Sequence, residues 1–135
     1  MKHNYHLFTF FIALFLGINY TNATIVEIRA IGLAGQAQSY SPANPTVYVG
    51  DTIRWLNQNG THTSASKIIP AGAAPWNGDI PTDGVGYFQY VVTVPGTYTY
   101  LCHINLGGGN GHGMNGSFEA KAATTGITTI NDSFS

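Results

Sequence analysis

Short β-branched and aromatic segments separated by Gly and Pro restrict the fold of this chain more than any other feature. The candidate strands are residues 24–31, 46–49, 52–56, 87–94, 97–101 and 117–120. Residues 70–86, which are rich in Gly, Pro, Ala and Asp, predict a long irregular connection. Beyond the first two dozen residues no segment has helical periodicity. The pattern predicts an all-β fold, a single-domain β-sandwich or barrel of about a hundred residues.

Length and charge exclude several classes of protein. A chain of 135 residues has room for one domain. Hydrophobic residues make up 44% of it and charged residues 8%, with a net charge of -1. This composition argues against disorder, which needs low hydrophobicity and high net charge. It also argues against a nucleic-acid partner, because phosphate recognition requires clustered Lys and Arg.

The N-terminal segment has the layout of a secretory signal peptide. Lys2 precedes an apolar run over residues 7–18, and the small residues around Ala23 follow. A membrane anchor is the alternative, but the run is shorter than the roughly 18–20 residues that span a bilayer. We expect residues 1–23 to be a signal peptide cleaved after Ala23, with no stable membrane insertion afterwards. Residues 24–121 are then the folded domain, and residues 122–135 a flexible tail.

The groups available for chemistry are few. The acidic residues of the predicted domain are scattered, so a general acid–base pair is not indicated. The remaining candidates are His62, Cys102, His103, His112 and Met114. Thiolate, imidazole and thioether together favour copper. Structural zinc is the competing metal, but it prefers four strong ligands, usually with paired cysteines, and this chain has one Cys.

Three stretches and one loop resemble the blue (type 1) copper proteins of the plastocyanin- and azurin-like cupredoxin family. Residues 45–55 are similar to its second and third strands, and His62 follows on the next loop. Residues 94–102 resemble the strand that delivers the Cys ligand, and residues 114–118 resemble the axial Met with the strand after it. The resemblance implies a Greek-key β-sandwich that binds one type 1 copper ion through His62, Cys102, a second His and Met114.

The position of the second His departs from the family pattern. In the family it lies two to four residues beyond Cys, where this chain has Asn105. His103 is adjacent to Cys102, and neighbouring strand residues point to opposite faces. His112 lies in a Gly-rich loop that can bend toward a metal. We therefore predict His62, Cys102, His112 and Met114 as the ligands, with His103 as the alternative to His112.

Together with the expected signal peptide, the resemblance implies an exported protein that carries single electrons between redox protein partners and is not an enzyme. We expect a monomer located in the periplasm, or else secreted or held at the cell surface. The second location is suggested by residues 125–131, which resemble the start of a bacterial C-terminal secretion domain. The unusual spacing of the second His keeps a second hypothesis open, a copper-binding, storage or interaction module without redox turnover. A copper enzyme is a third possibility, but such enzymes need further His ligands for a second copper centre.

Overall fold

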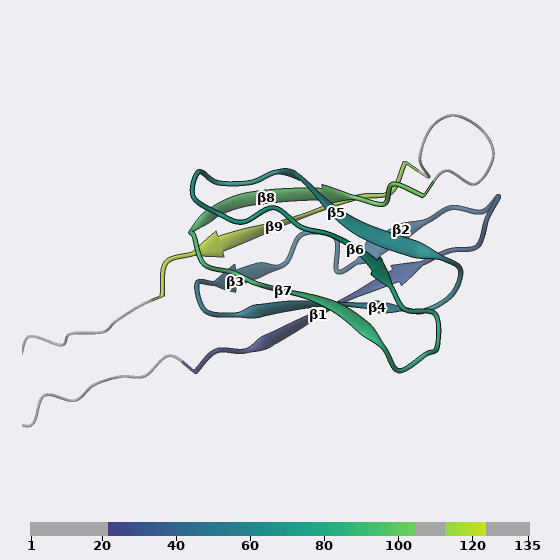
Figure 1. The fold of residues 1–135 in the computed structure, drawn as a ribbon, viewed down its shortest axis with the longest axis horizontal. Coiled ribbons are helices and arrows are strands. Elements are labelled where there is room, and N and C mark those ends of the chain that lie inside the picture. The colour runs from purple at the N-terminus through teal and green to yellow at the C-terminus, as the bar shows by residue number, and fades with distance from the viewer. Residues whose placement is uncertain (1–21, 105–112, 124–135) are drawn as a thin grey trace, which may run out of the picture. The chain divides into compact units, whose positions relative to one another are not determined.

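The computed structural model describes residues 22–104 and 113–123, which fold into two facing β-sheets (Figure 1). The strands are β1 (Ile25–Ile31), β2 (Ser39–Ser41), β3 (Thr46–Tyr48), β4 (Thr52–Asn57), β5 (His62–Ile68), β6 (Asn77–Ile80), β7 (Tyr87–Val91), β8 (Gly96–Leu101) and β9 (Asn115–Lys121). Every regular element in these residues is a strand, and none of them forms a helix long and apolar enough to cross a membrane. The all-β sandwich predicted from the sequence is confirmed.

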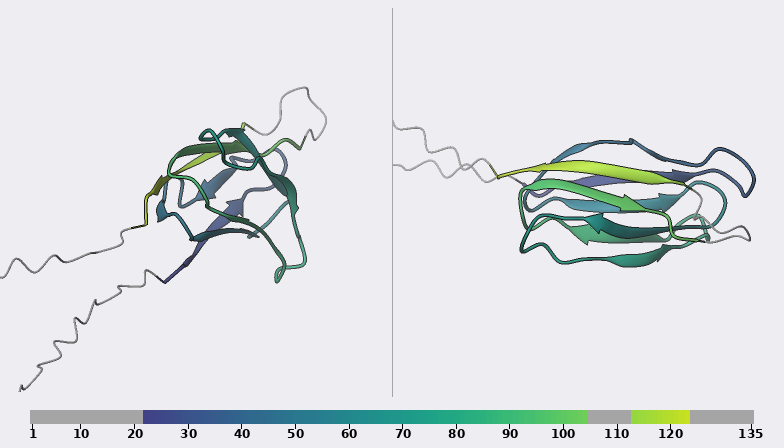
Figure 2. Two further views of the ribbon diagram at one scale, coloured as in Figure 1. Left: turned by 60° about the vertical axis from the view of Figure 1, so that its left-hand side comes forward. Right: turned by 90° about the horizontal axis from the view of Figure 1, so that it is seen from above.

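The chain crosses repeatedly between the two sheets, although β1 and β2, β5 and β6, and β8 and β9 are consecutive strands within one sheet. One sheet has the order β2-β1-β4-β7 and the other the order β3-β9-β8-β5-β6. Strands β1 and β4 run parallel, as do β3 and β9, whereas the other pairs are antiparallel. Figure 2 shows the two sheets as stacked layers. The repeated crossing from one layer to the other is the connectivity of a Greek-key sandwich.

Alternation along the strands explains which side chains fill the space between the sheets. In β4, Ile53 and Trp55 are buried while Thr52 and Arg54 are partly exposed. The same two-residue period buries Tyr98 and Tyr100 of β8 and Phe118 and Ala120 of β9. The pleat of the strands directs these side chains between the sheets, and because they are apolar or aromatic they form one core.

Aromatic rings dominate that core. The Trp76 ring lies 4.4 Å from the Tyr90 ring and 5.6 Å from the Trp55 ring, measured between centroids. Its indole Nε1–H donates to Ser64 Oγ at 2.9 Å, which satisfies the one polar group of the ring. The Tyr98 and Phe118 rings stack at 4.6 Å. These large aromatic residues therefore pack the core between the sheets.

Three strands, β2, β5 and β6, are absent from the sequence-based expectation. The expectation of an irregular connection over residues 70–86 is wrong for β6, whose Gly, Asn and Asp residues have little strand preference. β6 is a strand because it pairs with β5, with His62 opposite Ile80 and Thr63 opposite Asp79. Tertiary pairing overrides local propensity at this edge of the sheet. β7 is also shorter than expected, since it ends at Val91.

The two ends of the sandwich carry different parts of the chain. β8 ends and β9 begins at one end, whereas β1 begins and β9 ends at the opposite end (Figure 1). Leu101 pairs with Asn115 and with Ala65, so the start of β5 lies at the same end as the junction of β8 and β9. This end therefore collects the residues around His62, Cys102 and Met114.

Candidate metal centre

Three of the four predicted ligands lie at that end of the sandwich. His62 is the first residue of β5, Cys102 directly follows β8, and Met114 directly precedes β9. Their side chains are almost completely buried, with exposed fractions of 1% for His62 and 2% for both Cys102 and Met114. Residues far apart in the sequence therefore meet because three neighbouring strands of one sheet begin or end together.

The Cys102 sulfur is held by Thr63, the residue after His62. The Thr63 backbone N–H donates to Cys102 Sγ at 3.4 Å, and the Thr63 hydroxyl lies 3.7 Å from the same sulfur. On the other side, the Cys102 backbone N–H donates to the Met114 carbonyl at 3.0 Å. Cys102 thus lies between the His62–Thr63 peptide and Met114.

The His62 ring is oriented by the loop that precedes β5. Its Nε2 lies 2.9 Å from the Asn59 carbonyl oxygen. Because a carbonyl can only accept, Nε2 carries the proton in the neutral ring and the lone pair is at Nδ1. Metal-binding His residues commonly donate their other N–H to such a carbonyl. The tautomer of His62 is therefore the one that offers Nδ1 to a metal.

The same loop is anchored tightly to the β1 side of the fold. The Gly32 backbone N–H donates to Asn59 Oδ1 at 2.6 Å. Gly60 has a φ of +81°, and a Cβ there would lie 2.2 Å from the Gly32 carbonyl oxygen. Only Gly tolerates both the backbone conformation and the close approach.

His103, unlike the buried Cys102 before it, lies at the surface. Its side chain is exposed, and its Nδ1 lies 3.1 Å from the Thr63 hydroxyl. The His103 backbone N–H donates to the same hydroxyl at 3.0 Å. Thr63 therefore connects the sulfur and the exposed imidazole. The sequence analysis missed Thr63, although its position directly after a candidate ligand is the signal that could have identified it.

His112, the predicted second imidazole ligand, lies outside the described residues. Within residues 22–104 and 113–123, no three His, Cys, Asp or Glu side chains are grouped so that they could hold a metal ion. A site formed by His62, Cys102 and His112 includes the His112 imidazole, which is not among these described residues. The assignment of His112 stays a prediction.

Tyr40 closes the inner side of the site. Its hydroxyl donates to the Thr63 carbonyl. Burial raises the pKa of Tyr40 far above its ordinary value, and the proximity of Cys102 raises it further. Tyr40 is therefore a neutral donor at every physiological pH, and its bond to Thr63 supports the residue that holds the sulfur.

Comparison with solved structures identifies the fold of this arrangement of strands. A pseudoazurin from Sinorhizobium matches with a TM-score of 0.57 and 23% identity, over 73% of this chain and 74% of that one. A fern plastocyanin matches with a TM-score of 0.52 and 22% identity, over 71% of this chain and 100% of the plastocyanin. The chain has the cupredoxin fold. A Cu-containing nitrite reductase from Thermus scotoductus shares this fold, with a TM-score of 0.53 and 18% identity, over 81% of this chain and 25% of that one.

Sequence comparison adds nothing to this structural likeness. No protein-family model matches the chain, and no curated protein matches it. The cupredoxin fold is therefore recognised here through its three-dimensional arrangement.

The described donors fit the copper ion that cupredoxin-like proteins such as Cu-containing nitrite reductase hold. Cys102 offers a buried sulfur with two donors directed at it. His62 offers Nδ1, and Met114 offers a buried thioether next to Cys102. Soft sulfur ligands together with imidazole select copper over hard cations such as Mg²⁺ or Ca²⁺.

Proposed function

We propose that this cupredoxin-fold protein is an exported type 1 copper protein that carries single electrons between redox partners. The observation that carries the proposal is the contact of Cys102 Sγ with the peptide that follows His62, beside Met114. It supports a site in which a cysteine sulfur, an imidazole and a thioether lie at one end of the sandwich. We propose His112 as the second imidazole ligand.

In this proposal the chain's own residues keep the site nearly unchanged between oxidation states. Bound copper would supply one-electron exchange between Cu(I) and Cu(II). Thr63 holds the sulfur from the β5 side, and Asn59 fixes the His62 ring. Burial of Cys102 and Met114 excludes water from the ligands. A site pre-formed by hydrogen bonds rearranges little when one electron is added, which favours rapid transfer.

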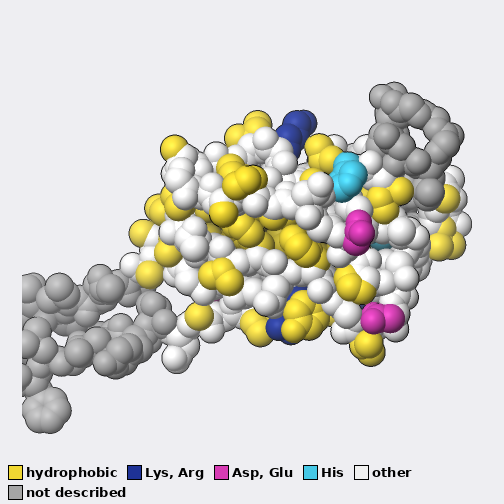
Figure 3. Space-filling view, in the orientation of Figure 1, with side chains coloured by type: hydrophobic (Ala, Val, Ile, Leu, Met, Phe, Trp, Pro, Cys, Tyr) yellow, Lys and Arg dark blue, Asp and Glu magenta, His cyan; other side chains and the backbone are white. Residues whose placement is uncertain are grey.

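The sparse surface charge is consistent with transient encounters in which electrostatic attraction does little to guide redox partners. On the face seen in Figure 3, the Lys, Arg, Asp and Glu side chains are isolated and do not gather into a patch of one sign. A net charge of -1 is consistent with this view. Weak redox encounters use small interfaces, and slow salt-independent association is expected where charges are sparse. We propose a monomer that meets donor and acceptor proteins in turn.

The first test is the colour and magnetic spectrum of the copper-loaded protein. Wild type should show an intense visible thiolate-to-copper band and a small copper hyperfine coupling in electron paramagnetic resonance. Cys102→Ser should lose both while remaining folded. A colourless wild type at saturating copper would refute the proposal. A coloured protein without a reversible one-electron couple in voltammetry would favour the second function, copper binding or storage without redox turnover.

The second test separates His112 from His103. His112→Gly should lose the blue spectrum, and added imidazole should restore it by filling the missing position. His103→Gly, the matched control beside Cys102, should retain the spectrum without imidazole. The reverse result would assign the second ligand to His103 instead.

A further inference from the structure

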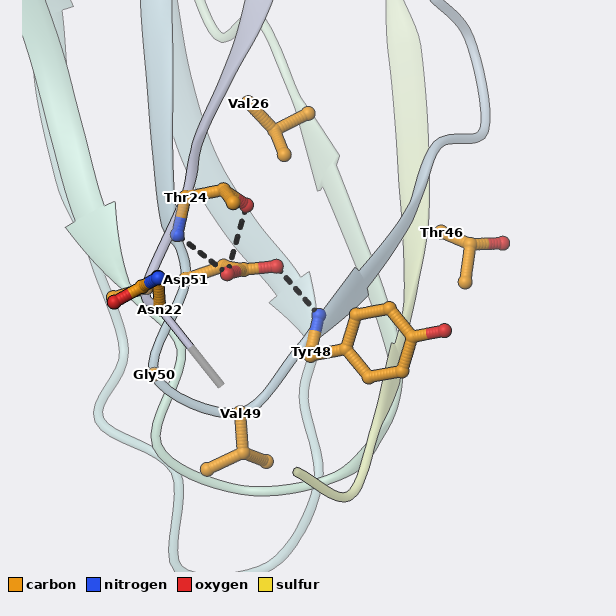
Figure 4. A pocket seen from close by; sticks show the side chains of 9 residues that line it. Asn22, Thr24, Val26, Thr46, Tyr48, Val49, Gly50 and Asp51 are labelled. Atoms are coloured by element: carbon orange, nitrogen blue, oxygen red, sulfur yellow. Dashed lines mark hydrogen bonds between the residues drawn. The ribbon is translucent and has the colours of Figure 1, made fainter. Parts of the chain in front are cut away.

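A buried carboxylate lies at the end of the sandwich opposite the candidate metal centre. Asp51 is 4% exposed. Its Oδ1 accepts hydrogen bonds from the Thr24 backbone N–H at 2.8 Å and the Thr24 hydroxyl at 2.9 Å. Its Oδ2 accepts from the Tyr48 backbone N–H at 2.8 Å. Figure 4 shows the Asp51 side chain between Thr24 and Tyr48.

These three donors are uncharged in the continuous chain. Burial by itself would raise the pKa of Asp51, but the hydrogen bonds from Thr24 and Tyr48 outweigh it and hold the pKa below its ordinary value. Asp51 is therefore an anion at neutral pH. A buried anion is normally matched by a cation, because neutral donors replace only part of its lost hydration.

One of the donor atoms is the nitrogen that signal-peptide cleavage would convert into a cation. Hydrolysis of the Ala23–Thr24 peptide bond consumes one water molecule, leaves a carboxylate on Ala23 and frees the Thr24 nitrogen as an ammonium group. That nitrogen already points at Asp51 Oδ1. Asp51 is the one charged residue among those lining the adjacent 390 Å³ cavity, whose wall includes Asn22 and Ala23.

We propose that Ala23–Thr24 is a processing site whose new α-ammonium group forms an ion pair with Asp51 and clamps the start of β1. This inference rests on the export that forms part of the proposed function, and it does not involve copper. The Thr24 carbonyl accepts from the Thr52 backbone N–H at 2.9 Å, at the start of the parallel β1–β4 pairing. Because β1 lies between β2 and β4, the clamp secures an inner strand of its sheet.

The first experiment exports the full chain and determines the mass and N-terminal sequence of the product. The expected N-terminal residue is Thr24. A product that begins at any other residue overturns the proposal, because its amine would not be the atom held by Asp51.

The second experiment displaces the amine without removing the hydrogen bond. Two Ser residues are inserted between Ala23 and Thr24 in the full chain, so that after cleavage a Thr24 amide still donates to Asp51. The insertion should lower the folded-to-unfolded ratio of the metal-free protein about three- to tenfold in urea titrations, the range expected for a partly buried ion pair. In the Asp51→Asn background the same insertion should have no effect. An equal effect in both backgrounds, or none in either, overturns the ion pair.

A third measurement does not depend on how well Asp51→Asn folds. The pKa of the α-amine, followed by NMR after isotopic methylation, should lie above the ordinary value of about 8 in the processed wild type. In the Ser-insertion protein it should be ordinary. Equal values in the two proteins overturn the proposal, while a failure to bind copper in either would count only against the electron-carrier function.

Discussion

Replacement of Gly60 by Ala tests how strongly the loop before β5 is constrained to present His62. The Ala side chain would have to adopt φ near +81° and place its Cβ 2.2 Å from the Gly32 carbonyl oxygen. The matched control is Gly72→Ala. Gly72 has a similar φ of +87°, but a Cβ there meets nothing within 4 Å.

The two variants share one energetic cost and differ in another. The left-handed conformation costs Ala about 1–2 kcal/mol, and reduced freedom of the unfolded chain returns about 0.4–1 kcal/mol. Gly72→Ala should therefore lose about 1 kcal/mol. In Gly60→Ala the new Cβ must also displace the Gly32 backbone, which is hydrogen-bonded to Asn59. By analogy with overpacking of a core, this displacement adds about 1–3 kcal/mol to the loss of stability. Its total loss should be about 2–4 kcal/mol.

Urea and thermal unfolding of the metal-free proteins measure both losses. Tm should fall by about 4–8 °C for Gly72→Ala and by about twice that or more for Gly60→Ala. The Gly60 variant should also bind copper more weakly, since the displaced Asn59 carbonyl no longer orients His62. Equal losses of stability in the two variants would refute the claim that close approach to Gly32 constrains this loop.

Three further predictions follow from the hydrogen bonds and pKa shifts. Burial, with Tyr98 nearby, raises the pKa of Tyr90 to about 12 in the folded protein. The unfolded chain releases this phenol proton near its ordinary pKa of 10, so the free energy of unfolding falls as pH rises from 10 to 12. Tyr90→Phe should reduce that fall in urea titrations, and an unchanged alkaline profile would contradict it. Asp51 has a lowered pKa, so its stabilisation is present above about pH 4 and is lost in more acidic solution. Asp51→Asn should be less stable than wild type at pH 7 and show a flatter acid limb in the same titrations. Thr63→Val removes a hydroxyl near Cys102 Sγ and should lower the reduction potential of the copper-loaded protein in voltammetry, whereas Thr63→Ser should stay close to wild type.

Much of the fold was predictable because strands such as β4 and β8 carry a strong local signal. The alternation through Ile53 and Trp55 and the paired aromatics Tyr98 and Tyr100 are buried on one face, as a period of two requires. β5 and β6 were not predictable in this way. Their residues are small or polar, and they become strands by pairing with each other and with β8.

The sequence predicts candidate metal ligands but not the residues that hold them in place. The single Cys with nearby His and Met predicts copper as the metal, because few residue combinations favour it. Thr63 was missed because a Thr within a polar segment has no distinctive pattern. Its importance comes from two contacts across about forty positions, to Cys102 and to His103.

The order of residues by itself determined the class of fold and the set of candidate soft ligands, since both depend on residue type and local period. Tertiary structure alone decided that the peptide after His62 contacts the Cys102 sulfur, and that Thr24 and Asp51 meet at the far end. Such contacts depend on which strands become neighbours in a sheet, and strand pairing is a property of the whole folded chain that no single segment encodes.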